Sequence, residues 1–173
     1  MSKKAKIAII SILSIIIIGI IIAAICITPQ LLVNNKTLSK GNVNVTVNIP
    51  KNFKYEEENE DVKTAKITKN DGEYTLLLQI DTDTIKYWYN EDFTKYKEDK
   101  VKNNSAKEVT INGVTGFEYY DTSTGEYQII LPTKEQSTVK LVVIPVNRFE
   151  NPTAEQIVNE EDVQNIVNSI KIN

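Results

Sequence analysis

Apolar and polar residues alternate through much of the chain after residue 42, and this alternation predicts β-strands. Between residues 43 and 49 valine or isoleucine fills every second position, and Pro50 ends the run. Similar β-rich runs follow it. The predicted strands are residues 43–50, 62–68, 73–80, 108–111, 114–120, 126–132 and 137–146. Together they predict a sheet of about six or seven strands.

Short turns between these runs predict that the strands are antiparallel. Asp71-Gly72 and Asn112-Gly113 are residue pairs that tolerate the positive φ of a tight hairpin turn. The segment TSTG at 122–125 turns the chain again before the run EYQIILP. The last predicted strand, 137–146, is apolar on both faces, so we expect it in the middle of the sheet.

Two segments show the spacing of amphipathic helices. Near the C-terminus four apolar residues form one stripe, with Asn159 as the expected N-cap. They are Val163, Ile166, Val167 and Ile170. A second helix is expected over 84–102, capped by Asp83 or Thr84. Its stripe is Ile85, Trp88, Tyr89, Phe93 and Tyr96. The expected fold is therefore α+β, an antiparallel sheet covered by helices.

A long apolar run precedes these elements. Residues 7–27 contain no charge and no proline, and as a helix they would be roughly 31 Å long, about the thickness of a bilayer's hydrocarbon core. The run predicts a single transmembrane helix. The lysines of the stub 1–6 place the N-terminus in the cytoplasm and the rest outside the cell. A polar linker at 28–42 would then lead to an extracytoplasmic domain at 43–173.

Cys26, the only cysteine, allows a second interpretation of this run. It could be the lipidated first residue of a bacterial lipoprotein. However, Ile25 stands where the processing peptidase requires a small residue, and the run is longer than the roughly 7–15 apolar residues of a cleavable signal. We therefore favour a retained anchor in the lipid bilayer, with Cys26 as one of its apolar residues.

Charge and composition narrow the partners of the exterior part. Three of the 20 basic residues precede the apolar run, so the remainder carries 17 basic and 23 acidic residues. An acidic domain does not attract nucleic acid, whose binding needs clustered Lys and Arg. The exterior part has no cysteine and therefore no disulfide, and its length suits one core.

Three stretches within residues 43–172 form a set of structural motifs, VNIPKNF, INGVTGFEY and VQNIVNSIKI. Together they resemble the PsbP-like family, which includes small membrane-anchored prokaryotic surface proteins. The resemblance implies an antiparallel sheet covered by helices and an address at the cell surface. It implies no reaction, because most prokaryotic members have no assigned activity and the motifs are structural.

Several catalytic chemistries are excluded by composition. The chain has no histidine, which removes Ser-His and Cys-His nucleophile systems and the commonest zinc ligand. The acidic clusters at 56–61 and 81–84 could offer oxygen ligands to calcium, but neither has the spacing of a calcium loop. A solvated loop and a helix cap are the favoured interpretations. We expect no metal, no cofactor and no catalytic residue.

The aromatic stripe supplies the candidate ligand-binding residues, Trp88, Tyr89 and Tyr96. Amphipathic rings bind sugars and peptides, but such a stripe more often packs a helix on a sheet, and burial of Trp88 is the favoured expectation. The expected function is a non-catalytic binding or assembly module whose partner is another envelope protein or a cell-wall component. The alternative is an extracytoplasmic hydrolase that uses paired carboxylates.

Overall fold

The computed structural model describes residues 33–59 and 62–173. In this part of the chain no helix is long and apolar enough to cross a membrane. The predicted anchor at 7–27, its Cys26 and the cytoplasmic stub lie outside the described residues. Residues 34–173 form a compact unit of their own.

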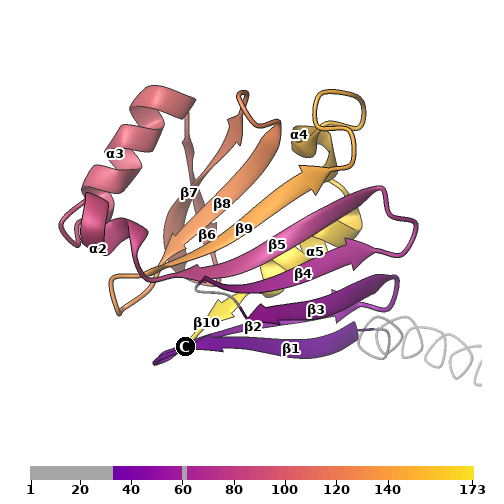
Figure 1. The fold of residues 1–173 in the computed structure, drawn as a ribbon, viewed down its shortest axis with the longest axis horizontal. Helices are drawn as coiled ribbons and strands as arrows, with labels where there is room; N and C mark the ends of the chain where they lie inside the picture. Colours follow the sequence, from indigo (N-terminus) through magenta and orange to yellow (C-terminus); the bar gives the residue numbers. More distant parts are fainter. Residues whose placement is uncertain (1–32, 60–61) are drawn as a thin grey trace, which may run out of the picture. The chain divides into compact units, whose positions relative to one another are not determined.

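Seven antiparallel strands form the larger sheet, in the order β3-β4-β5-β9-β8-β7-β6 (Figure 1). Their bounds are β3 Phe53–Asn59, β4 Lys63–Lys69, β5 Tyr74–Asp81, β6 Lys107–Ile111, β7 Val114–Asp121, β8 Glu126–Pro132 and β9 Thr138–Pro145. The predicted antiparallel α+β architecture is thus confirmed. The last long strand, β9, occupies the central position, as its apolar residues on both faces predicted.

The predicted hairpins are present. Asn112 and Gly113 both have positive φ, 48° and 83°, and they join β6 to β7. This is the backbone that a type I′ turn requires. Gly72 also has a positive φ of 78° and lies in the turn between β4 and β5. In both hairpins the residues that tolerate left-handed backbone fix the place where the chain reverses.

A second sheet of three strands was not predicted. It contains β1 Val33–Lys40, β2 Val43–Pro50 and β10 Lys171–Ile172, in the order β1-β2-β10. The prediction of one sheet is therefore corrected to two. The predicted linker at 28–42 is also corrected, because residues 33–40 form a strand and the compact unit begins at residue 34 rather than 43. In β1 only Leu38 is buried, so the strand lacks the apolar alternation that would reveal it.

The first acidic cluster is not a simple solvated loop. Glu56, Glu57 and Glu58 lie in β3, paired with Lys66, Ala65 and Thr64 of β4. Ion pairs join Glu56 to Lys54 and Glu57 to Lys63. Because β3 is at the edge of the sheet, its charged side chains remain in contact with solvent while the backbone pairs on one side.

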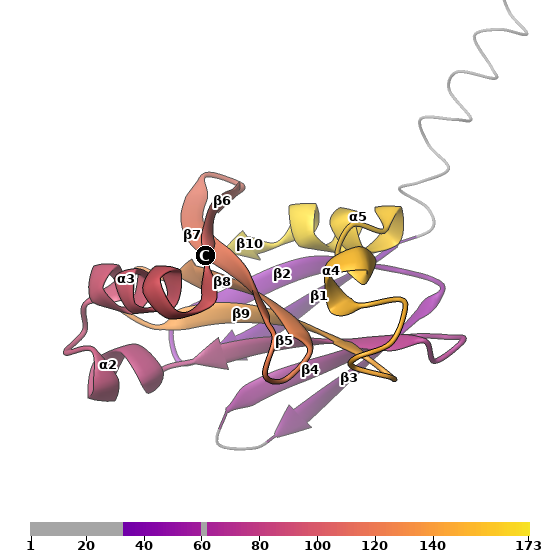
Figure 2. The same ribbon diagram turned by 90° about the horizontal axis from the view of Figure 1, so that it is seen from above.

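The main core lies on one face of the seven-stranded sheet, which we call the closed face. Here side chains of β5, β8 and β9 pack against β2, α4 Ala154–Ile157 and α5 Glu161–Ser169. Figure 2 shows α5 and β2 together on one side of β3, β4 and β5. The buried stripe of α5 contains the residues predicted from its spacing, Val163, Ile166 and Val167, with Ile170 buried at its end.

The N-terminal cap of this helix differs from the prediction. Glu160 rather than Asn159 is the N-cap residue, and it makes no side-chain capping bond. The Asn159 side chain instead donates to the carbonyl oxygen of Glu155 at 2.8 Å. Glu160 accepts hydrogen bonds from the Tyr74 hydroxyl at 3.0 Å and from Lys69 at 3.4 Å, and so ties the start of α5 to β4 and β5.

Candidate functional site

The second predicted helix is two helices. α2 spans Thr84–Trp88 and α3 spans Phe93–Asn104, so the single helix expected over 84–102 is corrected. Asn90 and Glu91 between them have left-handed φ values of 54° and 64°. The N–H groups of Tyr89 and Glu91 both donate to the carbonyl of Ile85, at 3.2 Å and 3.0 Å, and so close the end of α2. The chain therefore changes direction directly after Trp88.

Carboxylates fix the beginning of both helices. Asp81 at the end of β5 accepts from the backbone N–H groups of Asp83 and Thr84 and from the Thr84 hydroxyl. The predicted helix cap in the 81–84 cluster is thus provided by Asp81, since neither Asp83 nor Thr84 caps with its own side chain. At α3, Asp92 accepts from the N–H groups of Thr94 and Lys95, as an N-cap residue does.

A second, smaller core holds α2 and α3 against the opposite face of the sheet from the closed face. Its buried members are Ile85, Tyr96, Phe117, Tyr119 and Ile130. Strand alternation explains the separation of the two cores, because Ile130 of β8 points to one face and its neighbours Ile129 and Leu131 point to the other. The rings of Tyr96 and Phe117 meet edge to face with centroids 5.4 Å apart.

Trp88 is not part of this core. Its side chain is 82% exposed, so the expectation that the whole aromatic stripe is buried is wrong at this residue. Ile85 and Tyr96 are buried as expected, and Tyr89 and Phe93 are half-buried. Trp88 is the last residue of α2, and the left-handed residues that follow turn the chain, so Trp88 is not aligned with Phe93 and Tyr96 of α3 as one unbroken helix would align it.

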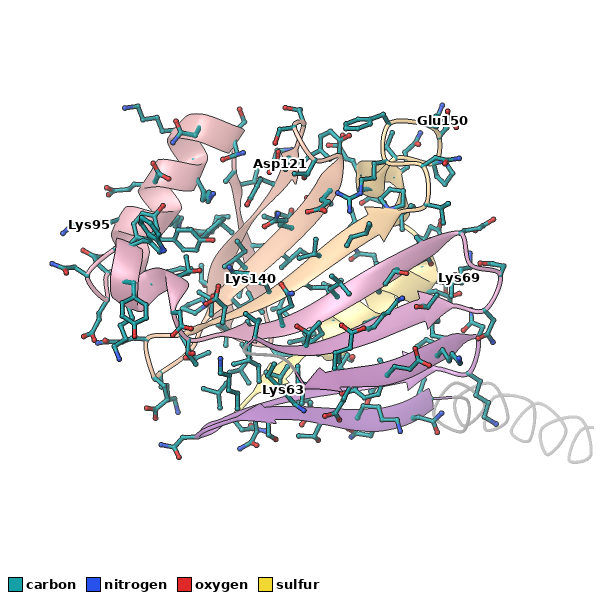
Figure 3. The ribbon with its side chains drawn as sticks, viewed as in Figure 1. Lys63, Lys69, Lys95, Asp121, Lys140 and Glu150 are labelled. Atoms are coloured by element: carbon teal, nitrogen blue, oxygen red, sulfur yellow. The ribbon has the colours of Figure 1, made fainter. Side chains whose placement is uncertain are left out.

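All three candidate ligand-binding residues border one hollow of about 470 Å³. Trp88, Tyr89 and Tyr96 contribute its aromatic side together with Tyr119 of β7. Its polar side includes Lys100 of α3, Asp121 of β7, Gln128 of β8 and Lys140 of β9. Figure 3 shows the labelled Lys140 and Asp121 on the part of the sheet beside α2 and α3. The sequence candidates are thus brought together, and six other polar or aromatic residues join them, Thr84 included.

The tyrosine hydroxyls of this hollow differ in their hydrogen bonds. Tyr119 donates to the side-chain oxygen of Gln128 at 2.9 Å, and Tyr89 donates to Asp99 at 3.0 Å. The Tyr96 hydroxyl makes no hydrogen bond to a described residue, and Tyr96 borders the hollow although its side chain as a whole is only 4% exposed. Burial, more than the neighbouring Tyr119 and Asp81, raises the pKa of Tyr96. Burial likewise raises the pKa of Tyr119 to about 12.

The charges around the hollow occur in compensating pairs. Lys140 forms an ion pair with Asp81, in which both side chains are largely buried. Burial by itself would raise the pKa of Asp81, but hydrogen bonds from Lys140 and Thr84 outweigh it and hold this pKa well below its usual range. Hydrogen bonds from Ser123 lower the pKa of Asp121, and Lys100 adds to this effect. Both carboxylates are therefore firmly ionised.

Lys100 also lies over two of the rings. Its Nζ is 5.8 Å from the centroid of Tyr96 and 5.7 Å from the centroid of Tyr119, within cation–π range. The ammonium group is thus held at the border of the hollow, beside the two buried tyrosines. The arrangement can hold a small polar ligand against an aromatic wall.

Sequence reasoning missed the strand residues of the hollow, although two signals were present. Lys140 is a charged residue within an otherwise apolar central strand, which is unusual without a partner. Tyr119 and Gln128 lie opposite one another in the β7–β8 hairpin, and this pairing follows from the predicted turn at 122–125. Lys100 and Asp121 carry no such signal in the sequence.

The described residues contain no group of three or more His, Cys, Asp or Glu side chains that could hold a metal ion. Comparisons with protein-family models, with curated proteins and with solved structures found no match for this chain. The candidate site therefore rests on its own geometry.

Proposed function

We propose that the protein is a non-catalytic binding module of the cell envelope and that its ligand binds in the hollow between α2, α3 and the sheet. The observation that carries this proposal is the exposed Trp88 at the border of a hollow that Tyr96 also lines, with a hydroxyl that makes no hydrogen bond to another described residue. A ligand in the hollow would cover part of the exposed indole and could exchange a hydrogen bond with this hydroxyl.

The electrostatics support binding rather than catalysis. A hydrolase with paired carboxylates needs one of them protonated near neutral pH, which requires a raised pKa. Asp121 lines the hollow and Asp81 lies beside it in an ion pair with Lys140, and the pKa of each is lowered. No observation in the described residues favours the hydrolase alternative at this site.

We place this module outside the cell on the basis of the sequence. The uncharged run at 7–27 would be a single membrane anchor, and the lysines before it would keep the N-terminus in the cytoplasm. Protease added to cells with a permeable wall should then digest the domain without lysis, and protection until lysis would contradict the topology. The resemblance to the PsbP-like family stays a prediction.

Binding through the hollow is tested with the full chain in lipid nanodiscs. Cell-wall fragments isolated from the cells in which the protein naturally occurs are mixed with the protein and sedimented. The fraction of the protein that sediments with the fragments is measured. Trp88→Ala should reduce binding strongly. Tyr87→Ala is the matched control, because Tyr87 is also exposed (70%) on α2 but does not border the hollow. Equal binding by wild type and Trp88→Ala would contradict the proposed site.

A further inference from the structure

We infer that the ligand of the hollow is a neutral sugar chain. This inference rests on the proposed binding function and gives it a chemical class. Three properties of the described residues carry it: an exposed aromatic face, polar groups at the hollow that can donate and accept hydrogen bonds, and the absence of a net positive charge.

The aromatic wall has the amphipathic character that a sugar ring requires. A sugar ring presents C–H groups on its faces and hydroxyls around its edge. Trp88 is 82% exposed and borders the hollow, so its indole is available to cover one face of such a ring. Tyr89 is half-buried, and its ring centroid lies 4.8 Å from that of Tyr96. This contact fixes the rings, so little conformational freedom would be lost on binding.

The polar groups match hydroxyls better than ions. The Tyr96 hydroxyl can donate and accept, and within residues 33–59 and 62–173 it has no partner. The Gln128 side-chain oxygen already accepts from Tyr119, and its amide nitrogen makes no hydrogen bond to another described residue. A sugar hydroxyl both donates and accepts, so one hydroxyl can serve either of these groups.

The charges do not select an anion. Lys140 is paired with Asp81, and Lys100 lies near Asp121, so the two cations of the hollow are balanced by two carboxylates. A phosphate or carboxylate ligand needs a cation that is not already neutralised. The volume of about 470 Å³ falls in the range of small-molecule sites, roughly 300–1,000 Å³. A neutral, polar ligand with apolar ring faces satisfies all of these conditions.

The test is a calorimetric titration of the full chain in nanodiscs with defined probes. The neutral probes are cellotetraose, maltotetraose and chitotetraose, and the contrasting probes are inorganic phosphate and tetra-alanine. We expect at least one tetrasaccharide to bind and the contrasting probes to show no binding. Trp88→Ala should abolish the signal, and Tyr87→Ala should leave the affinity unchanged.

Tyr96→Phe separates a role in binding from a role in folding. It removes only the unpartnered hydroxyl, so the melting temperature should not fall. The affinity for the tetrasaccharide should fall by about three- to tenfold, the range expected for one lost hydrogen bond. Tyr87→Phe is the control, and it should change neither quantity.

The outcomes distinguish the two proposals. Trp88-dependent binding to cell-wall fragments without binding of any tetrasaccharide would overturn the sugar assignment and leave the binding function in place. Binding of tetra-alanine or phosphate in place of a sugar would also overturn it. Tetrasaccharide affinity that is unchanged in Tyr96→Phe would contradict the role assigned to that hydroxyl and with it this geometry. Cell-wall binding that does not depend on Trp88 would overturn the proposed function itself.

Discussion

The two faces of the seven-stranded sheet are built differently, although both are covered by helices. On the closed face, α5 inserts an unbroken apolar stripe between β2 and the sheet, and the residues of that stripe are buried. On the opposite face, α2 and α3 cover a small aromatic core, and beside it a hollow remains with an exposed tryptophan. The same strands contribute side chains to both faces of the sheet. The difference between the faces therefore comes from the helices that cover them.

The comparison indicates how a fold can separate stability from binding. The closed face joins residues that are distant in sequence, such as Val45 of β2, Leu78 of β5 and Ile166 of α5, into one apolar cluster. The aromatic core is a smaller cluster and leaves polar groups of β8 and β9 accessible between α2, α3 and the sheet. We therefore expect substitutions on the closed face to affect folding and substitutions at the border of the hollow to affect ligand binding.

The largest effect should come from a charge on the closed face. Val167 is buried on α5, so Val167→Asp would place a carboxylate among apolar side chains with no cation to pair with. We expect a loss of about 3–5 kcal/mol in the free energy of unfolding, measured by denaturant titration. Asn165→Asp is the control on the exposed side of the same helix, and it should change stability by less than about 0.5 kcal/mol. Similar values for the two variants would mean that α5 is not packed as described.

An intermediate effect is expected at Asp81, which joins the sheet to the start of α2. Asp81→Asn removes the charge that Lys140 and Thr84 stabilise, and it should cost about 1–3 kcal/mol at neutral pH. The pKa of Asp81 is lowered by folding, so its contribution is complete above the usual carboxyl pKa of about 4 and is lost as the pH falls below that value. The stability difference between wild type and Asp81→Asn should therefore narrow below about pH 4.

Asp83→Asn is the control for this pH dependence. Asp83 is exposed, and its side chain accepts only a 3.3 Å hydrogen bond from Thr82 among the described residues. Its substitution should have little effect at any pH. A stability difference for Asp81→Asn that widens as the pH falls would have the opposite sign to this account.

The closed face was largely predictable from the sequence, and the hollow was only partly so. Strict alternation in residues 43–49 and the stripe from Val163 to Ile170 give the faces of β2 and α5, because the core requires those side chains at those spacings. β1 and β10 were missed, since one has a single buried residue and the other is two residues long. Such strands depend on their neighbours for pairing, which no local pattern records.

At the hollow, the sequence identified the aromatic residues but not their surroundings. Trp88, Tyr89 and Tyr96 were candidates because of their type, and the structure brings them to one hollow. The break at Asn90 and Glu91 was not predicted, because neither is the glycine that usually occupies left-handed backbone. With it the alignment of Trp88 with Phe93 and Tyr96 is lost, and the predicted burial of Trp88 was wrong. The contributions of Gln128 and Lys140 required the strand order.

The smallest effect on folding should be that of Trp88→Ala. For a buried tryptophan this change would cost about 3–5 kcal/mol, but the exposed side chain of Trp88 has little packing to lose. We expect a change within about 0.5 kcal/mol, measured by far-ultraviolet circular dichroism because the variant has no tryptophan to report by fluorescence. Destabilisation by several kcal/mol would show that Trp88 belongs to the aromatic core.

The most direct test of an open, ligand-accessible hollow is the emission of Trp88 itself, because it is the only tryptophan in the chain. In the ligand-free protein the account predicts red-shifted emission that iodide quenches readily, since the indole is in water. Addition of a bound tetrasaccharide should shift the emission to the blue and protect it from iodide. Blue-shifted emission that iodide does not quench in the ligand-free protein would contradict the account, because it would mean that α2 and α3 bury Trp88 and close the hollow.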